Sequence, residues 1–309
     1  MPLYFPPERQ SIETPRTVFE DIYNRAIETI RERGIVERQD ILEIVRMQQE
    51  YEMDCHVVIA GQNGVGKTYL LLMMMKEYLK RSFMPNLLLA KHNYNEFIRF
   101  ILTQENTLLG VDELNQYLNY KKHSESQQTH LINQLELARS NRIGVIGCVR
   151  DPRKLTLNYR QGKMSIVIWI LDRFTAGGSY AAVFIANPSV ESRDRFGFSM
   201  IFENLENMAT VREVFESMPS FVGYMRIPDI AGIVPKDEIA GYKKAKAVAM
   251  AHAHVKECYE NYRKKKITLD ECVAEIEALR PKFGDEETDR LIDGIPKRRA
   301  AKEADDSGD

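Results

Sequence analysis

Short apolar runs alternate with helix-like segments through the middle of the chain. The runs are rich in β-branched residues and stay apolar at consecutive positions, which is typical of strands buried on both faces of a parallel sheet. The expected strands cover residues 56–60, 86–93, 107–111, 143–149, 163–171, 180–186 and 196–202. A turn at Gly177-Gly178 predicts that 180–186 runs antiparallel to the strand before it. The pattern therefore predicts an α/β fold whose mainly parallel sheet carries added antiparallel strands.

The N-terminal part is expected to be an extended, proline-rich arm followed by two helices. The first helix is predicted to open at Thr14-Pro15 and to stop at Gly34, and the second to cover about residues 37–52. The apolar face of the first is expected to hold Phe19, Ile22, Ala26 and Ile30. Two roles remain open for the pair: a lid or packing appendage on the core, or a module that docks a partner.

The C-terminal part is expected to be helical, because the strand signal ends at about residue 210. Residues 224–240 contain two prolines and are interpreted as a connector. A basic helix is predicted over 242–266, with eight lysines and arginines against two glutamates. Two short helices capped by Thr268 and Asp285 should follow.

These changes in pattern divide the chain into four segments. An N-terminal arm with its helical pair covers residues 1–54, and the core covers 55–205. A C-terminal helical region covers 206–295, and the polar tail 296–309 is expected to be disordered.

A glycine loop between the first core strand and a helix gives the strongest chemical signal. The stretch 61–68 fits the pattern G-x-x-x-x-G-K-[ST] and lies between a predicted strand and a predicted helix, as this pattern requires. Glycines let the backbone N–H groups turn toward phosphates, and the helix N-terminus adds positive charge. The residues expected to bind nucleotide are Gly61, Gln62, Asn63, Gly64, Val65, Gly66, Lys67 and Thr68. Lys67 is expected to reach the β- and γ-phosphates, and the Thr68 hydroxyl to ligate Mg²⁺.

An acidic pair follows the strand at 107–111. Asp112 and Glu113 come about 45 residues after the glycine loop, at the carboxyl end of a buried strand, which is where a P-loop site places its second acidic motif. Asp112 is predicted to hold Mg²⁺ through water. Glu113 is predicted to orient and activate the attacking water as general base. The sequence therefore predicts an ATPase that uses Mg²⁺.

The composition bears mainly on the cellular compartment of the protein and on its net charge. The 309 residues carry a net charge of −2, so any nucleic-acid site must be local. Four scattered cysteines without a C-x-x-C pair favour a reducing compartment and argue against a zinc or disulfide framework; they are Cys55, Cys148, Cys258 and Cys272. No signal core and no membrane-spanning run is expected, and the protein is predicted to be cytoplasmic, in the host cytoplasm if it is viral.

Each of two polar segments can be interpreted either as ordinary solvated surface or as a functional site. Lys121, Lys122 and His123 follow the acidic pair and form either a solvated loop or a contact with the phosphates of a polymer. His252 and His254 form an H-x-H pair on an alanine-rich helix, a pattern more typical of solvated side chains than of a metal site.

With these motifs in place, the chain resembles P-loop ATPases that have a catalytic glutamate, and most of all the HerA/FtsK-type DNA translocases with the viral genome-packaging ATPases. The resemblance covers about residues 55–205 and rests on Ala138-Arg139, the strand after it, and Asp151-Pro152. It implies a RecA-like P-loop sheet, a nucleic-acid track that is DNA, and a ring of identical chains such as a hexamer or pentamer. Where the group usually places glutamine, this sequence has Arg150.

Four arginines are candidates for an arginine finger, a cation that completes a site from a neighbouring subunit. They are Arg139, Arg142, Arg150 and Arg160. Arg150 could also sense the γ-phosphate within its own subunit. The helical ends could dock a capsid or another protein.

Two other functions remain open at this stage. An AAA+-type helicase loader or remodeller would need a helical lid with a sensing arginine after the core, which the C-terminal helices could supply. A nucleotide-dependent switch or scaffold with little turnover would not need the base Glu113.

Overall fold

The computed structural model describes residues 15–89, 94–118, 125–173, 179–186, 196 and 213–296. The chain divides into two compact units. The first consists of Met1–Leu88 and Asn93–Glu238, and the second of Leu89–His92 and Ile239–Asp309. The predicted strand at 196–202 lies outside the described residues except for Phe196.

Within the described residues, seven strands form one sheet in the order β2-β3-β4-β1-β5-β6-β7. The bounds are β1 His56–Ala60, β2 Leu87–Leu88, β3 Thr107–Val111, β4 Ile143–Val149, β5 Met164–Arg173, β6 Ser179–Ile185 and β7 Phe221–Ile227. Pairs among β1 to β5 are parallel, whereas β6 pairs antiparallel with both β5 and β7. The predicted α/β fold, a mainly parallel sheet with antiparallel additions, is confirmed.

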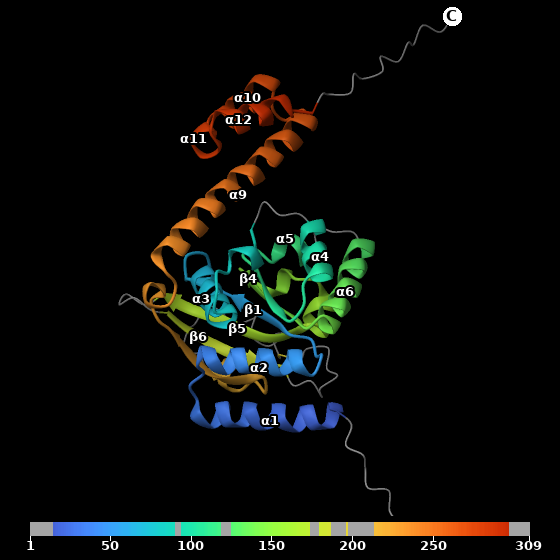
Figure 1. Ribbon diagram of the computed structural model, residues 1–309, viewed down its shortest axis with the longest axis vertical. Coiled ribbons are helices and arrows are strands. Elements are labelled where there is room, and N and C mark those ends of the chain that lie inside the picture. Colours follow the sequence, from blue (N-terminus) through green and yellow to red (C-terminus); the bar gives the residue numbers. More distant parts are fainter. Residues whose placement is uncertain are drawn as a thin grey trace, which may run out of the picture. The chain divides into compact units, whose positions relative to one another are not determined.

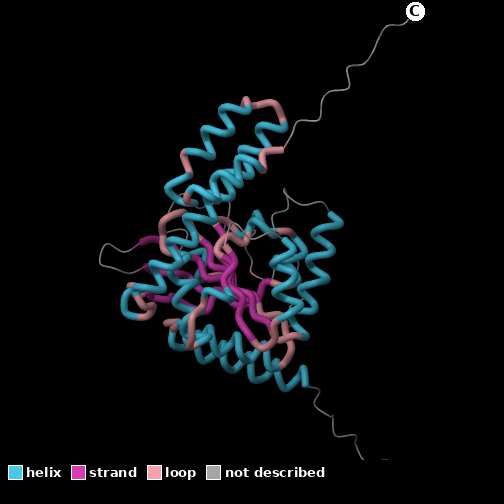
Figure 2. Tube along the Cα trace, turned by 45° about the horizontal axis from the view of Figure 1, so that its top comes forward, coloured by secondary structure: helices cyan, strands magenta, loops and turns pink. Residues whose placement is uncertain are grey.

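Helices cover both faces of the sheet in the first unit (Figures 1 and 2). The helices after β1 are α3 Lys67–Leu79, α4 Tyr94–Thr103, α5 Asn115–Leu118, α6 Glu125–Ser140 and α7 Leu157–Gly162. The chain moves outward from β1 to β2 and then back through β3 and β4. Right-handed crossovers therefore place α3 on one face and the next helices on the other.

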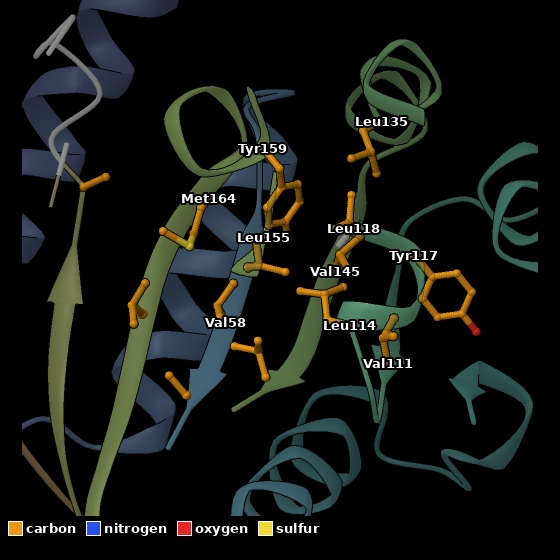
Figure 3. Packing of buried hydrophobic residues seen from close by; sticks show 14 of the residues in the cluster. Val58, Val111, Leu114, Tyr117, Leu118, Leu135, Val145, Leu155, Tyr159 and Met164 are labelled. Atoms are coloured by element: carbon orange, nitrogen blue, oxygen red, sulfur yellow. The ribbon is translucent and has the colours of Figure 1, made fainter. Parts of the chain in front are cut away.

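One large apolar cluster fills the space between the sheet and α4 to α7 (Figure 3). Alternate strand residues such as Val58, Val111 and Val145 meet Leu118 and Tyr159 from the helices, and all are buried. On the opposite face α3 lies close to β3, because residue 110 is a glycine: a Cβ there would come within 2.1 Å of Met75 Sδ. This close approach fixes the helix that carries the glycine loop against the strand that carries the acidic pair.

The N-terminal helices α1 (Pro15–Arg33) and α2 (Arg38–Glu50) also belong to the first unit and pack on the α3 side. The buried stripe of α1 is Phe19, Tyr23, Ile27 and Ile30. The predicted face is therefore corrected, because Ile22 is 41% exposed and Tyr23 lies in its place. The Tyr23 hydroxyl donates a hydrogen bond to the carbonyl of Ala186, so the pair is tied to the sheet.

The expectation that strands end at about residue 210 is wrong. Residues 221–227 form β7, which takes in the first residues of the predicted connector and pairs with β6.

Two further differences from the predicted elements are small. The second predicted strand, 86–93, is a strand only at β2 among its described residues, and Asn86 ends the 3-10 helix η1 (Met84–Asn86). Two other 3-10 turns, η2 Pro152–Lys154 and η3 Ile230–Gly232, follow β4 and β7.

The second unit is helical. It contains most of α9 (Lys236–Arg263), with α10 Leu269–Glu277, α11 Arg280–Phe283 and α12 Asp285–Asp293. Thr268 caps α10 as predicted, since its hydroxyl accepts a hydrogen bond from the backbone N–H of Glu271. Asp285 is not a cap: Gly284 is the N-cap of α12, and the Asp285 carboxylate pairs with Arg280. No helix in the described ranges combines the length and the apolar character that crossing a bilayer demands.

Candidate nucleotide-binding site

The glycine loop joins the carboxyl end of β1 to the first turn of α3. Gly61, Gly64 and Gly66 have φ values of +144°, +83° and +102°, a region that side chains with a Cβ rarely adopt. At Gly61 a Cβ would also lie 2.9 Å from the carbonyl oxygen of Ile170. The glycines are therefore required by the path of the backbone, which leads directly into the positive end of α3.

Lys67 is the first residue of α3, and its side chain turns back over the loop. Its Nζ donates hydrogen bonds to the carbonyls of Gly61 at 2.7 Å and Gln62 at 2.6 Å. Partial burial lowers the pKa of Lys67 from its ordinary value. Arg150 lowers this pKa further, whereas Cys148, Glu113 and Asp112 raise it. The ammonium is therefore within electrostatic reach of groups at the carboxyl ends of two strands, β3 and β4.

Thr68 and Asp112 meet across the gap between α3 and β3. The Thr68 hydroxyl donates a hydrogen bond to Asp112 Oδ1 at 2.8 Å, and the Asp112 side chain is buried. Hydroxyl and carboxylate oxygens are the ligands that Mg²⁺ prefers. This donor set fits the metal that the sequence predicts, and Thr68 and Asp112 are the residues that would hold it.

Asp112 and Glu113 are adjacent but have different environments. The backbone N–H of Asp112 bonds the carbonyl of Leu88, and that of Leu114 bonds the carbonyl of Cys148, both at about 3 Å. The turn is thus fixed on both sides of Glu113, whose side chain is exposed. Its carboxylate lies within electrostatic reach of Lys67, on the same edge of the sheet.

The four candidate arginines lie in different places. Arg150 follows β4 directly, is exposed, and acts electrostatically on Lys67 of the same chain. Arg142 precedes β4 at the opposite edge of the sheet, where it pairs with Glu52 at 3.3 Å. Arg139, at the end of α6, pairs with Glu136 and acts on Asp54, which precedes β1. Arg139 and Arg142 therefore lie away from the loop of their own subunit.

Arg160 has a local structural contact. It is half-buried on α7, and its Nε donates a hydrogen bond to the carbonyl of Leu155 at 3.2 Å. The predicted track residues Lys121, Lys122 and His123 lie outside the described residues.

Two residues that support the loop were not predicted. Ser179, the first residue of β6, donates a hydrogen bond from its hydroxyl to the carbonyl of Val65 at 3.1 Å. The backbone of Ile170 on β5 packs against Gly61. Both contacts join segments more than 100 residues apart in sequence. The only advance sign was the predicted antiparallel pairing of 180–186 with the strand before it, which returns the chain toward the loop.

A glycine loop between a buried strand and a helix, with an acidic pair on a neighbouring strand, defines the P-loop NTPase class. This chain carries a domain of that class. In particular, residues 42–152 match the model of a family described as Novel STAND NTPase 3. No curated protein sequence matches the chain.

Several solved structures share part of the fold at low sequence identity. The N-terminal domain of zonular occludens toxin from Neisseria meningitidis is 15% identical, with a TM-score of 0.31, over 43% of this chain and 84% of that chain. The DNA-packaging ATPase B204 from Sulfolobus Turreted Icosahedral Virus is 16% identical, with a TM-score of 0.29, over 40% of this chain and 78% of that chain. The genome packaging NTPase B204 from Sulfolobus turreted icosahedral virus 2, in complex with ATP-gammaS, is 14% identical, with a TM-score of 0.33, over 44% of this chain and 94% of that chain.

Proposed function

We propose that this P-loop NTPase hydrolyses ATP with Mg²⁺ and uses the energy to move double-stranded DNA through a ring of identical subunits. The loop 61–68 cradles the phosphates, and Lys67 neutralises the β- and γ-phosphates. Thr68 and Asp112 hold Mg²⁺, which supplies charge stabilisation for the departing phosphate. These roles follow from the contacts of Lys67 with the loop and of Thr68 with Asp112.

The placement of Glu113 is the observation that carries the proposal of hydrolysis. Backbone hydrogen bonds fix the turn on either side of it, while its side chain stays exposed at the edge where Lys67 lies. A carboxylate held this way can accept a proton from a water that attacks the γ-phosphate. A nucleotide-dependent switch with little turnover would not need such a base, so this placement favours hydrolysis.

The arginines support a division of labour between subunits. Arg150 acts on Lys67 within one chain, which suits a γ-phosphate sensor in cis. Arg139 and Arg142 are separated from the loop by the length of β4, seven residues or about 23 Å. Their guanidinium groups can serve only a neighbour's site, and such a role requires a ring or another oligomer.

The strands after β5 favour a translocase over an AAA+-type loader. The chain continues from β5 into two antiparallel strands, β6 and β7, and Ser179 on β6 supports the glycine loop. The loader alternative needs a helical lid with a sensing arginine after the core, which α9 and the helices after it could still supply, so the order of the strands is what separates the two functions.

DNA contact in this proposal is electrostatic and local, since the net charge of the chain is −2. Lys121, Lys122 and His123 are the first candidates because they follow Glu113 closely in sequence. The end of α9 is the second, with Arg263 exposed and three lysines directly after it. Phosphate contacts of this kind are independent of sequence and sensitive to salt. Of the two helical ends, the C-terminal helices are the surface we assign to a capsid or another protein partner.

The test compares ATP turnover with and without double-stranded DNA, alongside the mass of the protein in solution. We expect an oligomer whose basal ATPase rises on addition of DNA and falls back as salt is raised. Lys67→Ala serves as the blank, because it removes the ammonium that neutralises the phosphates. Turnover that DNA leaves unchanged would favour the loader or the switch, and a monomer at full activity would exclude the ring.

A further inference from the structure

Three side chains of metal-ligating type meet in the second unit, within one pair of helices. His254 and Cys258 are four residues apart on α9 and therefore lie on the same face of the helix. Glu275 comes from α10, near the end of that helix. The glycine loop belongs to the first unit, so this group is separate from the nucleotide site.

The three ligand atoms are already close. The Glu275 carboxylate oxygen Oε2 lies 2.5 Å from His254 Nε2 and 3.7 Å from Cys258 Sγ. One potential ligand atom from each residue lies within 4.8 Å of the other two. Around a tetrahedral zinc with bonds of about 2.0–2.3 Å, neighbouring ligand atoms are separated by roughly 3.3–3.7 Å. His254 and Glu275 are about half exposed, so both side chains have room to rotate toward that spacing.

We propose that His254, Cys258 and Glu275 bind a divalent transition metal, Zn²⁺ in the first instance, with water as the fourth ligand. The set of one imidazole, one thiolate and one carboxylate suits zinc rather than Mg²⁺ or Ca²⁺, which take oxygen ligands. Three protein ligands and one open position are the arrangement of a metal that exchanges water.

The buried thiol is the residue that gives the site its selectivity. Cys258 is buried, and its thiol donates a hydrogen bond to Glu275 Oε2 with the two heavy atoms 3.7 Å apart. Binding exchanges that proton for the metal: the S–H bond breaks, the S–Zn bond forms, and one proton passes to solvent. The thiolate then has the cation as its partner in place of the hydrogen bond to Glu275.

A metal here would stabilise a small unit with a small core. The apolar cluster of the second unit rests on five buried residues, which are Val255, Cys258, Tyr262, Cys272 and Ile276. Units of about 70 residues or fewer rarely obtain enough stability from one core, and a metal that joins two helices is a common addition. The ligands come from α9 and α10, the two helices that supply this cluster.

His252 provides an internal control. It is the other histidine of the H-x-H pair, but its ring packs at a tilt against that of Phe283, with centroids 4.6 Å apart, and not against Glu275. The site therefore does not use the H-x-H spacing. Its ligands are one histidine of the pair, a cysteine one turn further along, and an acid from the next helix.

Cobalt(II) titration of the purified full-length protein tests the proposal. A cysteine ligand gives near-ultraviolet thiolate-to-cobalt absorption, and a tetrahedral site gives intense visible bands. We expect one cobalt per chain, displaced by one zinc. Cys258→Ser should abolish the thiolate absorption, and His254→Ala and Glu275→Gln should each weaken binding by on the order of 100-fold or more, since even outer partners of a metal site are worth ~10–100-fold.

The matched control, His252→Ala, should bind cobalt as the wild type does. Zinc should also raise the thermal midpoint of the wild type but not of Cys258→Ser, while circular dichroism verifies that each variant is folded. Absence of thiolate absorption in the wild type, or its persistence in folded Cys258→Ser, would overturn the proposal. Equal loss in His252→Ala would place the site elsewhere.

Discussion

Glu113 and Asp112 are neighbours in sequence, yet the backbone gives them opposite environments. Asp112 is buried and accepts a hydrogen bond from Thr68, whereas Glu113 is exposed between two anchored backbone N–H groups. The same strand end can therefore provide a metal ligand and a base. The two side chains diverge in the turn that follows β3, which the backbone hydrogen bonds of Asp112 and Leu114 fix on either side of Glu113.

The first prediction concerns Glu113→Gln. The amide keeps the shape of the side chain but cannot accept a proton, so ATP should bind and remain intact. Nucleotide that co-purifies or is retained on gel filtration should be ATP, and turnover should fall by roughly 10²–10⁴-fold, the usual contribution of a general base. Lys67→Ala is the comparison, because it should lose nucleotide as well as turnover. Wild-type turnover in Glu113→Gln would place the base on another residue.

At the scale of elements, Gln49 shows how the N-terminal helices support the sheet. It is buried at the end of α2, and its amide donates hydrogen bonds to the carbonyls of Thr107 at 2.8 Å and Arg142 at 2.7 Å. Its carbonyl accepts a hydrogen bond from the Tyr78 hydroxyl on α3. One side chain thus joins the starts of β3 and β4 to the helix that follows the glycine loop. These contacts favour the packing appendage over the docking module for this pair.

Gln49→Leu should therefore destabilise the first unit. The leucine fills the volume but leaves buried carbonyls and the Tyr78 hydroxyl without their partner, and each such group costs about 1–3 kcal/mol. Urea unfolding followed by circular dichroism measures the change. Gln104→Leu is the matched control, because Gln104 is exposed and should change stability by less than about 0.5 kcal/mol. Equal stability of the two variants would contradict the role given to Gln49.

Much of the element order could be predicted because its signals are local. The loop 61–68, its flanking strand and helix, and the strand before Asp112 each carry a continuous pattern within about a dozen residues. β7 could not be found in this way. It pairs with β6 across a long connection, and Gly223 interrupts its apolar run where the backbone of Gly34 approaches closely. Pairing at long range leaves no signal within one window of sequence.

The site residues differ in the same way: some could be predicted from a local motif, and others only from the fold. The residues expected to bind nucleotide were predicted from motifs. Arg150 and Arg142 flank the same strand, β4, and only the fold shows that they lie at opposite ends of it. Ser179 and the group around Cys258 were also outside the reach of a motif. Their partners lie 114 and 17 residues away in sequence, on other elements.

At the scale of the whole molecule, the arginines before and after β4 predict nucleotide sites that neighbouring subunits share. Arg139→Ala or Arg142→Ala subunits keep an intact loop, and Asp112→Ala subunits keep their arginines. Mixing the two inactive proteins should restore part of the ATPase activity for whichever arginine acts in trans. Arg150→Ala mixed with Asp112→Ala should stay inactive, since both lesions affect the site of their own subunit. Rescue with Arg150→Ala, or rescue with neither Arg139→Ala nor Arg142→Ala, would remove this model.

The surface that contacts DNA can be located by charge reversal. Lys121→Glu with Lys122→Glu should leave basal ATPase intact, abolish its stimulation by DNA and flatten the salt dependence of binding. The comparison variant changes Arg263, Lys264 and Lys265 to Glu at the exposed end of α9. If stimulation survives the first change and is lost in the second, the contact belongs to α9.

Movement along DNA is the central claim, and displacement of a roadblock tests it most directly. Streptavidin is bound to a biotin at one end of a linear duplex, and its release is followed with time. We predict release by the wild type that requires ATP and Mg²⁺, and none by Glu113→Gln, which should bind ATP without turning it over. DNA-stimulated hydrolysis by the wild type without any release would contradict the account and leave an ATPase that binds DNA but does not travel along it.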